Sequence, residues 1–153
     1  MRVALVTGGG SGIGRSAALE LNKIDFTVYV VGRREEELIK TSSLATNNNH
    51  KIIPIKTDIT IGSQVIALFD KIKSDHGRID LLFNNAGMGA PRVPIEDLKE
   101  EDWRKTVDVN LTGSFLCSQQ AIKLMKNQSP QGGRIVNNGS VSAHSPRPDT
   151  IAY

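Results

Sequence analysis

Short apolar runs of β type alternate with helical segments along the whole chain. The five runs are residues 3–6, 26–31, 51–57, 79–83 and 133–137. Strands that alternate with helices form parallel sheets, because each crossover between parallel strands needs a connection as long as a helix. A chain of 153 residues has room for one such domain. We therefore predict a single α/β domain over residues 1–153, with a doubly wound parallel sheet of about five strands and helices on both faces.

Individual residues within this pattern predict how the elements are placed. Pro54 has no backbone N–H, so the strand around it belongs at an edge of the sheet. Gly77 follows a stretch of helical spacing and is the expected stop of that helix. Farther along, one long helix is expected. Its shared face is formed by Leu111, Phe115, Ser118, Ile122 and Met125.

A glycine-rich turn, residues 8–14, follows the first apolar run directly and leads into a helical segment. The free N–H groups and the positive dipole end of a helix start attract anions, and glycines let a phosphate approach the backbone closely. The dinucleotide-binding pattern is met in its alanine-tolerant form at Gly12-x-Gly14-x-x-Ala17. A nucleoside-triphosphate loop would be matched if Arg15 were a lysine. The third interpretation is a plain turn that only joins a strand to a helix.

Polar clusters follow the five predicted strands. They are the glycine turn, Gly32 to Arg34, Asp58, Asn84 to Gly87, and Ser140. Ligands of open parallel sheets bind outside the carboxyl ends of the strands, so we expect these clusters to surround one site. The fourth strand ends in Asn84, where a nucleoside triphosphatase would need a Mg²⁺-binding aspartate. That mismatch weighs against the triphosphate interpretation.

Composition and charge exclude several classes of protein. Hydrophobic residues make up 39% and charged residues 23% of the chain, as in ordinary globular proteins. The net charge of +3 is scattered among acidic residues, so we expect no nucleic-acid partner. The absence of a long apolar run and of a leader predicts a cytoplasmic protein without membrane contact. The single cysteine, Cys117, excludes an intramolecular disulfide, and no group of residues has metal-ligand spacing.

Four motifs in a fixed order resemble the short-chain dehydrogenase/reductase family, and together they span nearly the whole chain. Thr7 to Gly14 matches the family's Thr-Gly-x3-Gly-x-Gly turn, and Asn84 to Gly87 matches its Asn-Asn-Ala-Gly segment. Val109 to Gly113 is similar to the helix motif that carries a catalytic asparagine. Ser140 stands thirteen residues before Tyr153, as the family's serine and tyrosine do. The resemblance implies a Rossmann-type fold and an oxidoreductase that transfers a hydride between a nicotinamide and a carbonyl or alcohol substrate.

The resemblance also implies which residues bind the dinucleotide. The pyrophosphate would lie on the glycine turn, Asp58 would hold the adenine amino group, and the segment after the fourth strand would form the ribose wall. The residues so implied are Gly8, Ser11, Gly12, Ile13, Gly14, Asp58, Asn85, Ala86 and Gly87. For Asp58 a second interpretation is open, as the N-cap of the helix that follows.

The end of the second strand bears on the choice of cofactor. Arg33 and Arg34 follow Gly32, and planar guanidinium groups suit the 2′-phosphate of NADP. We therefore expect NADP, bound in part by Arg33 and Arg34. NAD is the alternative, because Ser11 occupies a position where NADP-preferring relatives often carry a basic residue.

Three residues would carry the chemistry by the same resemblance. Tyr153 would be the general acid and base, Ser140 would hydrogen-bond the substrate oxygen, and Asn110 would order a water in the proton relay. Ser140 and Tyr153 are therefore also the expected substrate-binding residues for a small carbonyl or alcohol. Two simpler interpretations stay open, Asn110 as a helix residue that bonds a neighbouring carbonyl and Ser140 as a turn residue.

The family's lysine, four residues after the tyrosine, has no counterpart because the sequence ends at Tyr153. We interpret the chain as a C-terminally truncated, N-terminal fragment of a longer enzyme, and expect the fragment alone to be inactive and poorly soluble. The complete protein is expected to form a homo-oligomer. The alternative function is that of a non-catalytic dinucleotide-binding protein that senses redox state. The presence of Ser140, Asn110 and Tyr153 argues against it, because a binding protein has no use for a proton relay.

Overall fold

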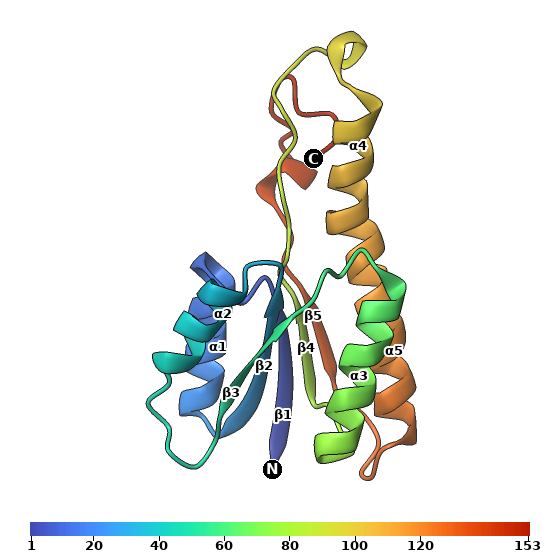
Figure 1. The fold of residues 1–153 in the computed structure, drawn as a ribbon. Coiled ribbons are helices and arrows are strands. Elements are labelled where there is room, and N and C mark those ends of the chain that lie inside the picture. The colour runs from blue at the N-terminus through green and yellow to red at the C-terminus, as the bar shows by residue number, and fades with distance from the viewer.

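The computed structural model describes residues 1–153 and contains one parallel sheet of five strands. The strands are β1 (Arg2–Thr7), β2 (Phe26–Gly32), β3 (Ile52–Lys56), β4 (Leu81–Asn84) and β5 (Arg134–Asn137). Their order is β3-β2-β1-β4-β5, with every neighbouring pair parallel (Figure 1). The strand order therefore reverses between β1 and β4, and the predicted doubly wound parallel sheet is confirmed.

Helices cover both faces of this sheet. α1 (Gly12–Lys23) and α2 (Glu35–Ser43) lie on one face, and α3 (Gly62–His76) and α5 (Gly113–Asn127) lie on the other (Figure 1). Gly77 ends α3 with φ +69°, a left-handed conformation that glycine adopts without steric cost, as predicted. None of the helices combines the length and the hydropathy that crossing a bilayer requires.

Two apolar cores result from the alternation of side chains along the strands. Val3 and Leu5 of β1 point into a core shared with α3 and α5. Ala4 and Val6 point into a second core on the side of α1 and α2. Both faces of β1 are completely buried. This explains why the sequence of a central strand is apolar at every position and not at every second one.

The expected strands agree with the structure to within one residue at each end, except at the start of the fourth. Pro54 lies on β3, which is an edge strand as predicted. The fourth strand begins at Leu81 instead of Ile79. Asp80 accounts for the shift, since its carboxylate accepts a hydrogen bond from the backbone N–H of Val3 at 2.8 Å and pairs with Arg78 at 2.6 Å. Burial of the Asp80 carboxyl acts to raise its pKa, but these hydrogen bonds outweigh burial and the pKa is lowered.

The predicted long helix is interrupted. α4 (Glu100–Val107) is followed by a π-helical turn, Asp108–Thr112, and then by α5. Three members of the predicted apolar face are exposed, Leu111, Phe115 and Ile122 at 67%, 58% and 47%, whereas Ser118 is half-buried and Met125 is buried. The buried face of α5 is formed by Gly113, Cys117, Ala121, Leu124 and Met125. Its first residue must be small, because a Cβ on Gly113 would lie 2.6 Å from the Ile59 side chain.

Candidate functional site

The glycine turn joins the central strand β1 to α1 at the point where the strand order reverses. Gly8 and Gly12 have φ of +66° and +50°, which only glycine adopts readily. Gly14 is required for another reason, since a Cβ there would lie 2.3 Å from the carbonyl oxygen of Gly8. The side chain of Ser11 does not cap α1, so no side chain takes the place of an anion at this helix start.

Thr7 ties the glycine turn to the loop after β4. Its hydroxyl oxygen accepts hydrogen bonds from the backbone N–H groups of Asn85 and Ala86, both at 2.9 Å. The Asn85 side chain in turn donates to the Thr7 carbonyl at 2.9 Å. No role was assigned to Thr7 from the sequence, although its place at the head of the matched glycine motif was a signal that it is needed.

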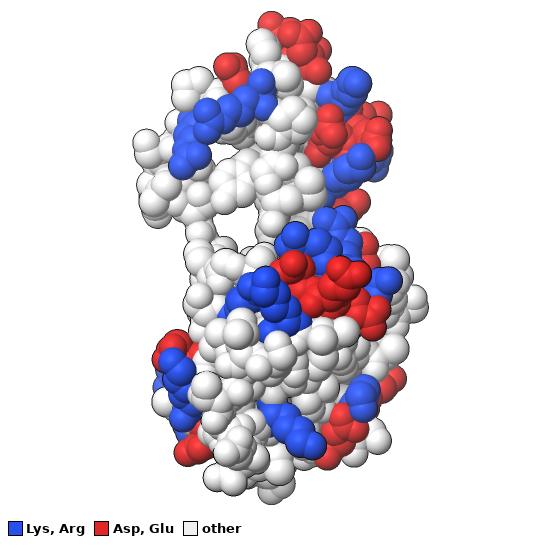
Figure 2. Space-filling model, turned by 60° about the vertical axis from the view of Figure 1, so that its left-hand side comes forward, with Lys and Arg blue, Asp and Glu red and all other residues white.

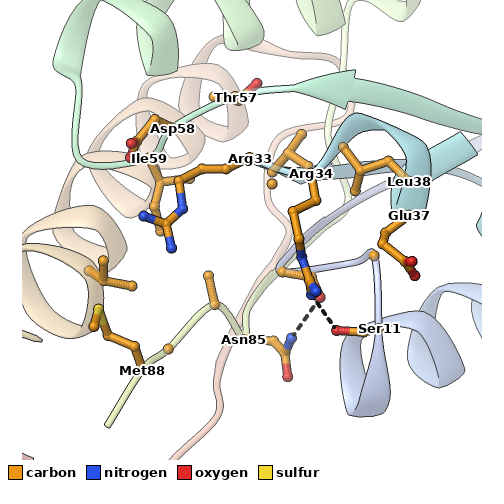
Figure 3. A pocket seen from close by; sticks show the side chains of 17 residues that line it. Ser11, Arg33, Arg34, Glu37, Leu38, Thr57, Asp58, Ile59, Asn85 and Met88 are labelled. Carbon is orange, nitrogen blue, oxygen red and sulfur yellow. Dashed lines mark hydrogen bonds between the residues drawn. The ribbon is translucent and has the colours of Figure 1, made fainter. Parts of the chain in front are cut away.

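A cleft of about 300 Å³ opens beside this turn (Figure 3). Eight of the predicted cofactor residues line it, namely Gly8, Ser11, Arg33, Arg34, Asp58, Asn85, Ala86 and Gly87. Arg34 extends toward Ser11 and donates to its hydroxyl at 3.2 Å, whereas Arg33 extends toward Asp58 and Ile59 on the other side of the cleft. The two arginines therefore serve different parts of one site.

Asp58 sits at the turn that leads into α3. Its Oδ1 accepts hydrogen bonds from the backbone N–H of Thr60 at 3.0 Å and from the Thr60 hydroxyl at 2.8 Å. It is not the N-cap of α3, a position held by Ile61. Asp58 therefore stabilises a turn just before the helix while also lining the cleft.

Arg15 does not line the cleft itself but holds Glu37 of α2, which does. Its guanidinium pairs with the Glu37 carboxylate at 2.6 Å, donates to the Thr41 hydroxyl at 3.0 Å, and also bonds the Gly10 carbonyl. The Thr41 hydroxyl in turn donates to the Gly9 carbonyl at 2.9 Å. The pairing of Glu37 with Arg15 carries no local sequence signal, because the two residues lie on different helices.

Asn110 lies on the π-helical turn between α4 and α5. Its side chain both accepts from the Met88 N–H at 2.8 Å and donates to the Met88 carbonyl at 2.9 Å. The amide thus holds the loop after Gly87 in place, which is close to the simpler interpretation of a residue that bonds a neighbouring carbonyl. Both main hydrogen-bonding directions of the Asn110 side chain are occupied by the protein itself.

Ser140 and Tyr153 lie together on the segment that follows β5. The two residues line one cleft with Asn110 and a second cleft, of about 490 Å³, with Ile13. The Ser140 hydroxyl accepts a hydrogen bond from the Ser142 N–H at 3.1 Å, and Tyr153 is 53% exposed. Figure 2 shows an opening between the upper part of the molecule, where Figure 1 places α4 and the loops after β4 and β5, and the body below.

The structure therefore brings the predicted residues to one edge of the sheet. Gly12 and Gly14 line none of the three clefts and act by shaping the turn. No three His, Cys, Asp or Glu residues are grouped as a metal site would require. The arrangement offers a helix start for phosphate, two guanidinium groups, and two hydroxyls beside the loop after β4.

Comparisons with known proteins agree with this geometry. The model of the short chain dehydrogenase family matches residues 2–153. A 3beta-hydroxysteroid dehydrogenase of Mediterraneibacter gnavus is 36% identical over 152 residues, which are 99% of this chain and 54% of that protein. The oxidoreductase YohF of Escherichia coli, itself uncharacterized, is 36% identical over 99% of this chain and 60% of its own length. The chain thus spans a little more than half of the curated relatives that it matches.

Solved structures show the same likeness in three dimensions. NAD⁺-bound xylitol dehydrogenase superposes with a TM-score of 0.92 at 30% identity, over 99% of this chain and 58% of that one. A metagenomic short-chain oxidoreductase in complex with NADP gives a TM-score of 0.92 at 28% identity, over 99% of this chain and 68% of that one. On the family match, the shared fold and the motifs gathered at the sheet edge, the chain belongs to the short-chain dehydrogenase family.

Proposed function

We propose that this chain forms the cofactor-binding and catalytic part of an NADP-dependent oxidoreductase, which transfers a hydride between the nicotinamide and a small carbonyl or alcohol substrate. One observation carries the proposal. The clefts at the switch in strand order are lined at one end by Arg33 and Arg34 and at the other by Ser140 and Tyr153. An extended dinucleotide has the length and the chemistry to occupy both ends.

The residues of the cleft fit such a dinucleotide. The turn is tight because Gly8 and Gly14 lack a Cβ, which would clash at both positions, and the uncapped start of α1 offers N–H groups to the pyrophosphate. Asp58 would accept from the adenine amino group with the carboxylate oxygen that Thr60 leaves free. Asn85 to Gly87 would lie against the ribose, fixed from behind by Thr7.

When bound, a nicotinamide would supply or accept the hydride, and residues of this chain would handle the proton. The Tyr153 hydroxyl would donate a proton to the substrate oxygen during reduction, and its phenolate would accept the alcohol's proton during oxidation. The Ser140 hydroxyl would hydrogen-bond the same oxygen and hold it near Tyr153. Asn110 would act by holding Met88, and with it the loop of Asn85 to Gly87, rather than by ordering a water with its side chain.

The coenzyme preference tests the proposal. In the whole protein, Arg33→Gln/Arg34→Gln is expected to raise the Kd for NADPH about 10- to 100-fold, because hydrogen bonds to a phosphate from charged groups are lost. The Kd for NADH should change little, since NADH has no 2′-phosphate. Fluorescence titration of both cofactors measures the two constants.

The matched control is Arg104→Gln, which removes a guanidinium from α4 that pairs with Glu100 away from the clefts. It should leave both cofactor constants unchanged. A wild-type protein that binds NADH as tightly as NADPH would refute the NADP assignment. Cofactor binding without hydride transfer to any carbonyl in a broad panel would favour the non-catalytic, redox-sensing alternative.

A further inference from the structure

Arg15 forms an ion pair with Glu37, and Glu37 lines the same cleft as Arg34. The side chains of Arg15 and Glu37 are 20% and 37% exposed, so the pair is partly shielded from water. Arg15 is held from three sides, by Glu37, by Thr41 and by the Gly10 carbonyl. An arginine fixed by several hydrogen bonds keeps its geometry better than a pair of free surface side chains does.

Besides Arg15, Glu37 has two cations within electrostatic reach, Lys40 and Arg34. Of these, Arg34 lines the same cleft as Glu37, and Figure 3 shows both side chains on the side of Ser11. The hydrogen bond from Arg15 is the main cause that lowers the pKa of Glu37, and the charges of Lys40 and Arg34 contribute to the same shift. Yet Arg34 forms no ion pair and donates only to the Ser11 hydroxyl. By pairing with the Glu37 carboxylate, Arg15 thus prevents that carboxylate from pairing with Arg34.

We propose that Arg15 is a positioning residue for coenzyme preference: by holding Glu37, it keeps Arg34 available for the 2′-phosphate of the dinucleotide. This inference rests on the proposed NADP function and names the residue on which Arg34 depends. Without Arg15, the Glu37 carboxylate pairs with Arg34 and places a negative charge where the phosphate binds. The loss of a free Arg34 and the added negative charge both weaken the binding of NADP. Neither affects NAD, whose ribose carries no 2′-phosphate.

The test measures binding of two adenine nucleotides to the whole protein by calorimetry, with 2′,5′-ADP and 5′-AMP as probes. Arg15→Gln is expected to weaken 2′,5′-ADP about tenfold and 5′-AMP far less, because only the former carries the 2′-phosphate. Arg15→Gln/Glu37→Gln should restore the affinity for 2′,5′-ADP, since the competing carboxylate is gone. Arg15→Lys keeps a cation beside Glu37 and should retain the preference.

The alternative role of Arg15 is purely structural, as a tie between the glycine turn and α2. In that case Arg15→Gln would weaken both nucleotides equally and the removal of Glu37 would rescue neither, which would overturn the proposal. A wild-type protein that does not prefer 2′,5′-ADP would instead contradict the NADP assignment itself. Circular dichroism of each variant confirms that the comparison is made between folded proteins.

A different observation bears on the substrate. The loops after β4 and β5 are joined where the Val93 N–H donates to the Asp149 carbonyl at 3.2 Å. This contact brings Arg92 and Arg147 to the cleft that Ser140 and Tyr153 also line. No Asp or Glu lines that cleft, and neither arginine side chain takes part in an ion pair or hydrogen bond.

We infer that the substrate carries an anionic group, a carboxylate in the first instance, held by Arg92 and Arg147 beside the reacting oxygen. Guanidinium groups bind carboxylates through paired hydrogen bonds, and two uncompensated charges in one cleft attract an anion. The inference rests on the proposed function, because it needs the reaction to occur at Ser140 and Tyr153.

Keto acids paired with their methyl esters test this inference in the whole protein with NADPH. Each acid is expected to exceed its ester about tenfold or more in kcat/KM. Arg92→Gln/Arg147→Gln should erase the difference by raising KM for the acids, whereas Arg104→Gln should retain it.

Equal use of acids and esters would overturn the inference alone. The inference alone would also be overturned if the double variant weakened the binding of NADPH as strongly as the binding of the acids. Turnover of neither series would contradict the proposed function.

Discussion

Gly14→Ala is expected to lower the free energy of unfolding by about 3 kcal/mol and to abolish measurable dinucleotide binding. The new Cβ would lie 2.3 Å from the Gly8 carbonyl oxygen and 2.5 Å from the Asn85 side-chain nitrogen. The first of these atoms belongs to the backbone of the turn, so the clash cannot be relieved by a change of rotamer. The turn and the loop after β4 must separate, and the phosphate site is lost. Urea unfolding and fluorescence titration with NADPH measure the two effects.

Gly62→Ala is the matched control for this variant. Gly62 is the first residue of α3, and a Cβ there would meet no atom within 4 Å. Alanine favours helix over glycine, so the unfolding midpoint should stay the same or rise slightly. If Gly14→Ala were as stable as Gly62→Ala, the close packing of the glycine turn against Asn85 would be wrong.

Tyr153→Phe is expected to lower kcat/KM for carbonyl reduction about 10²- to 10⁴-fold in the whole protein, since it removes the proposed proton donor. The Kd for NADPH should change far less than kcat/KM, because the residues proposed to bind the 2′-phosphate and the pyrophosphate are left intact. Steady-state kinetics and fluorescence titration separate chemistry from binding. Near-normal turnover by this variant would place the proton donor elsewhere.

Tyr29→Phe controls for the loss of a tyrosine hydroxyl as such. Tyr29 is buried in the core, and its hydroxyl donates to the Asp75 carboxylate at 2.5 Å. Burial is the main cause that raises its pKa, and the hydrogen bond to Asp75 adds to it. This variant should lose about 1 kcal/mol of stability and keep kcat, which is the opposite of the result expected for Tyr153→Phe.

The arrangement of the sheet could be predicted because it depends on local sequence patterns, namely the alternation of strand and helix segments and the position of proline. Alternating runs predict parallel strands, and Pro54 predicts an edge from a single missing N–H. The start of β4 could not be predicted, since it depends on Asp80 bonding to Val3 from a distant part of the chain. The prediction of which face of α5 is buried was wrong for a related reason. Close packing against Ile59 requires a glycine at position 113, and periodicity cannot reveal how close two elements lie.

The location of the site could be predicted more fully than its internal contacts. Parallel strands bring their carboxyl ends together, so Asp58, Asn85 and Ser140 meet at one edge without further information. The pair of Arg15 and Glu37 depends on how α1 and α2 face each other, which no local pattern encodes. The π-helical turn at Asn110 was likewise invisible, because the residues around it are compatible with a regular helix.

Cys117 faces inward on α5 and is completely buried, and burial raises the pKa of its thiol to about 12. Thiol reagents attack the thiolate, which the folded protein neither exposes nor forms in quantity at neutral pH. As the chain's only cysteine, it can therefore be labelled only when α5 moves away from the sheet. The rate of labelling at this one sulfur therefore measures how often α5, which lines the cleft of Ser140 and Tyr153, separates from the sheet.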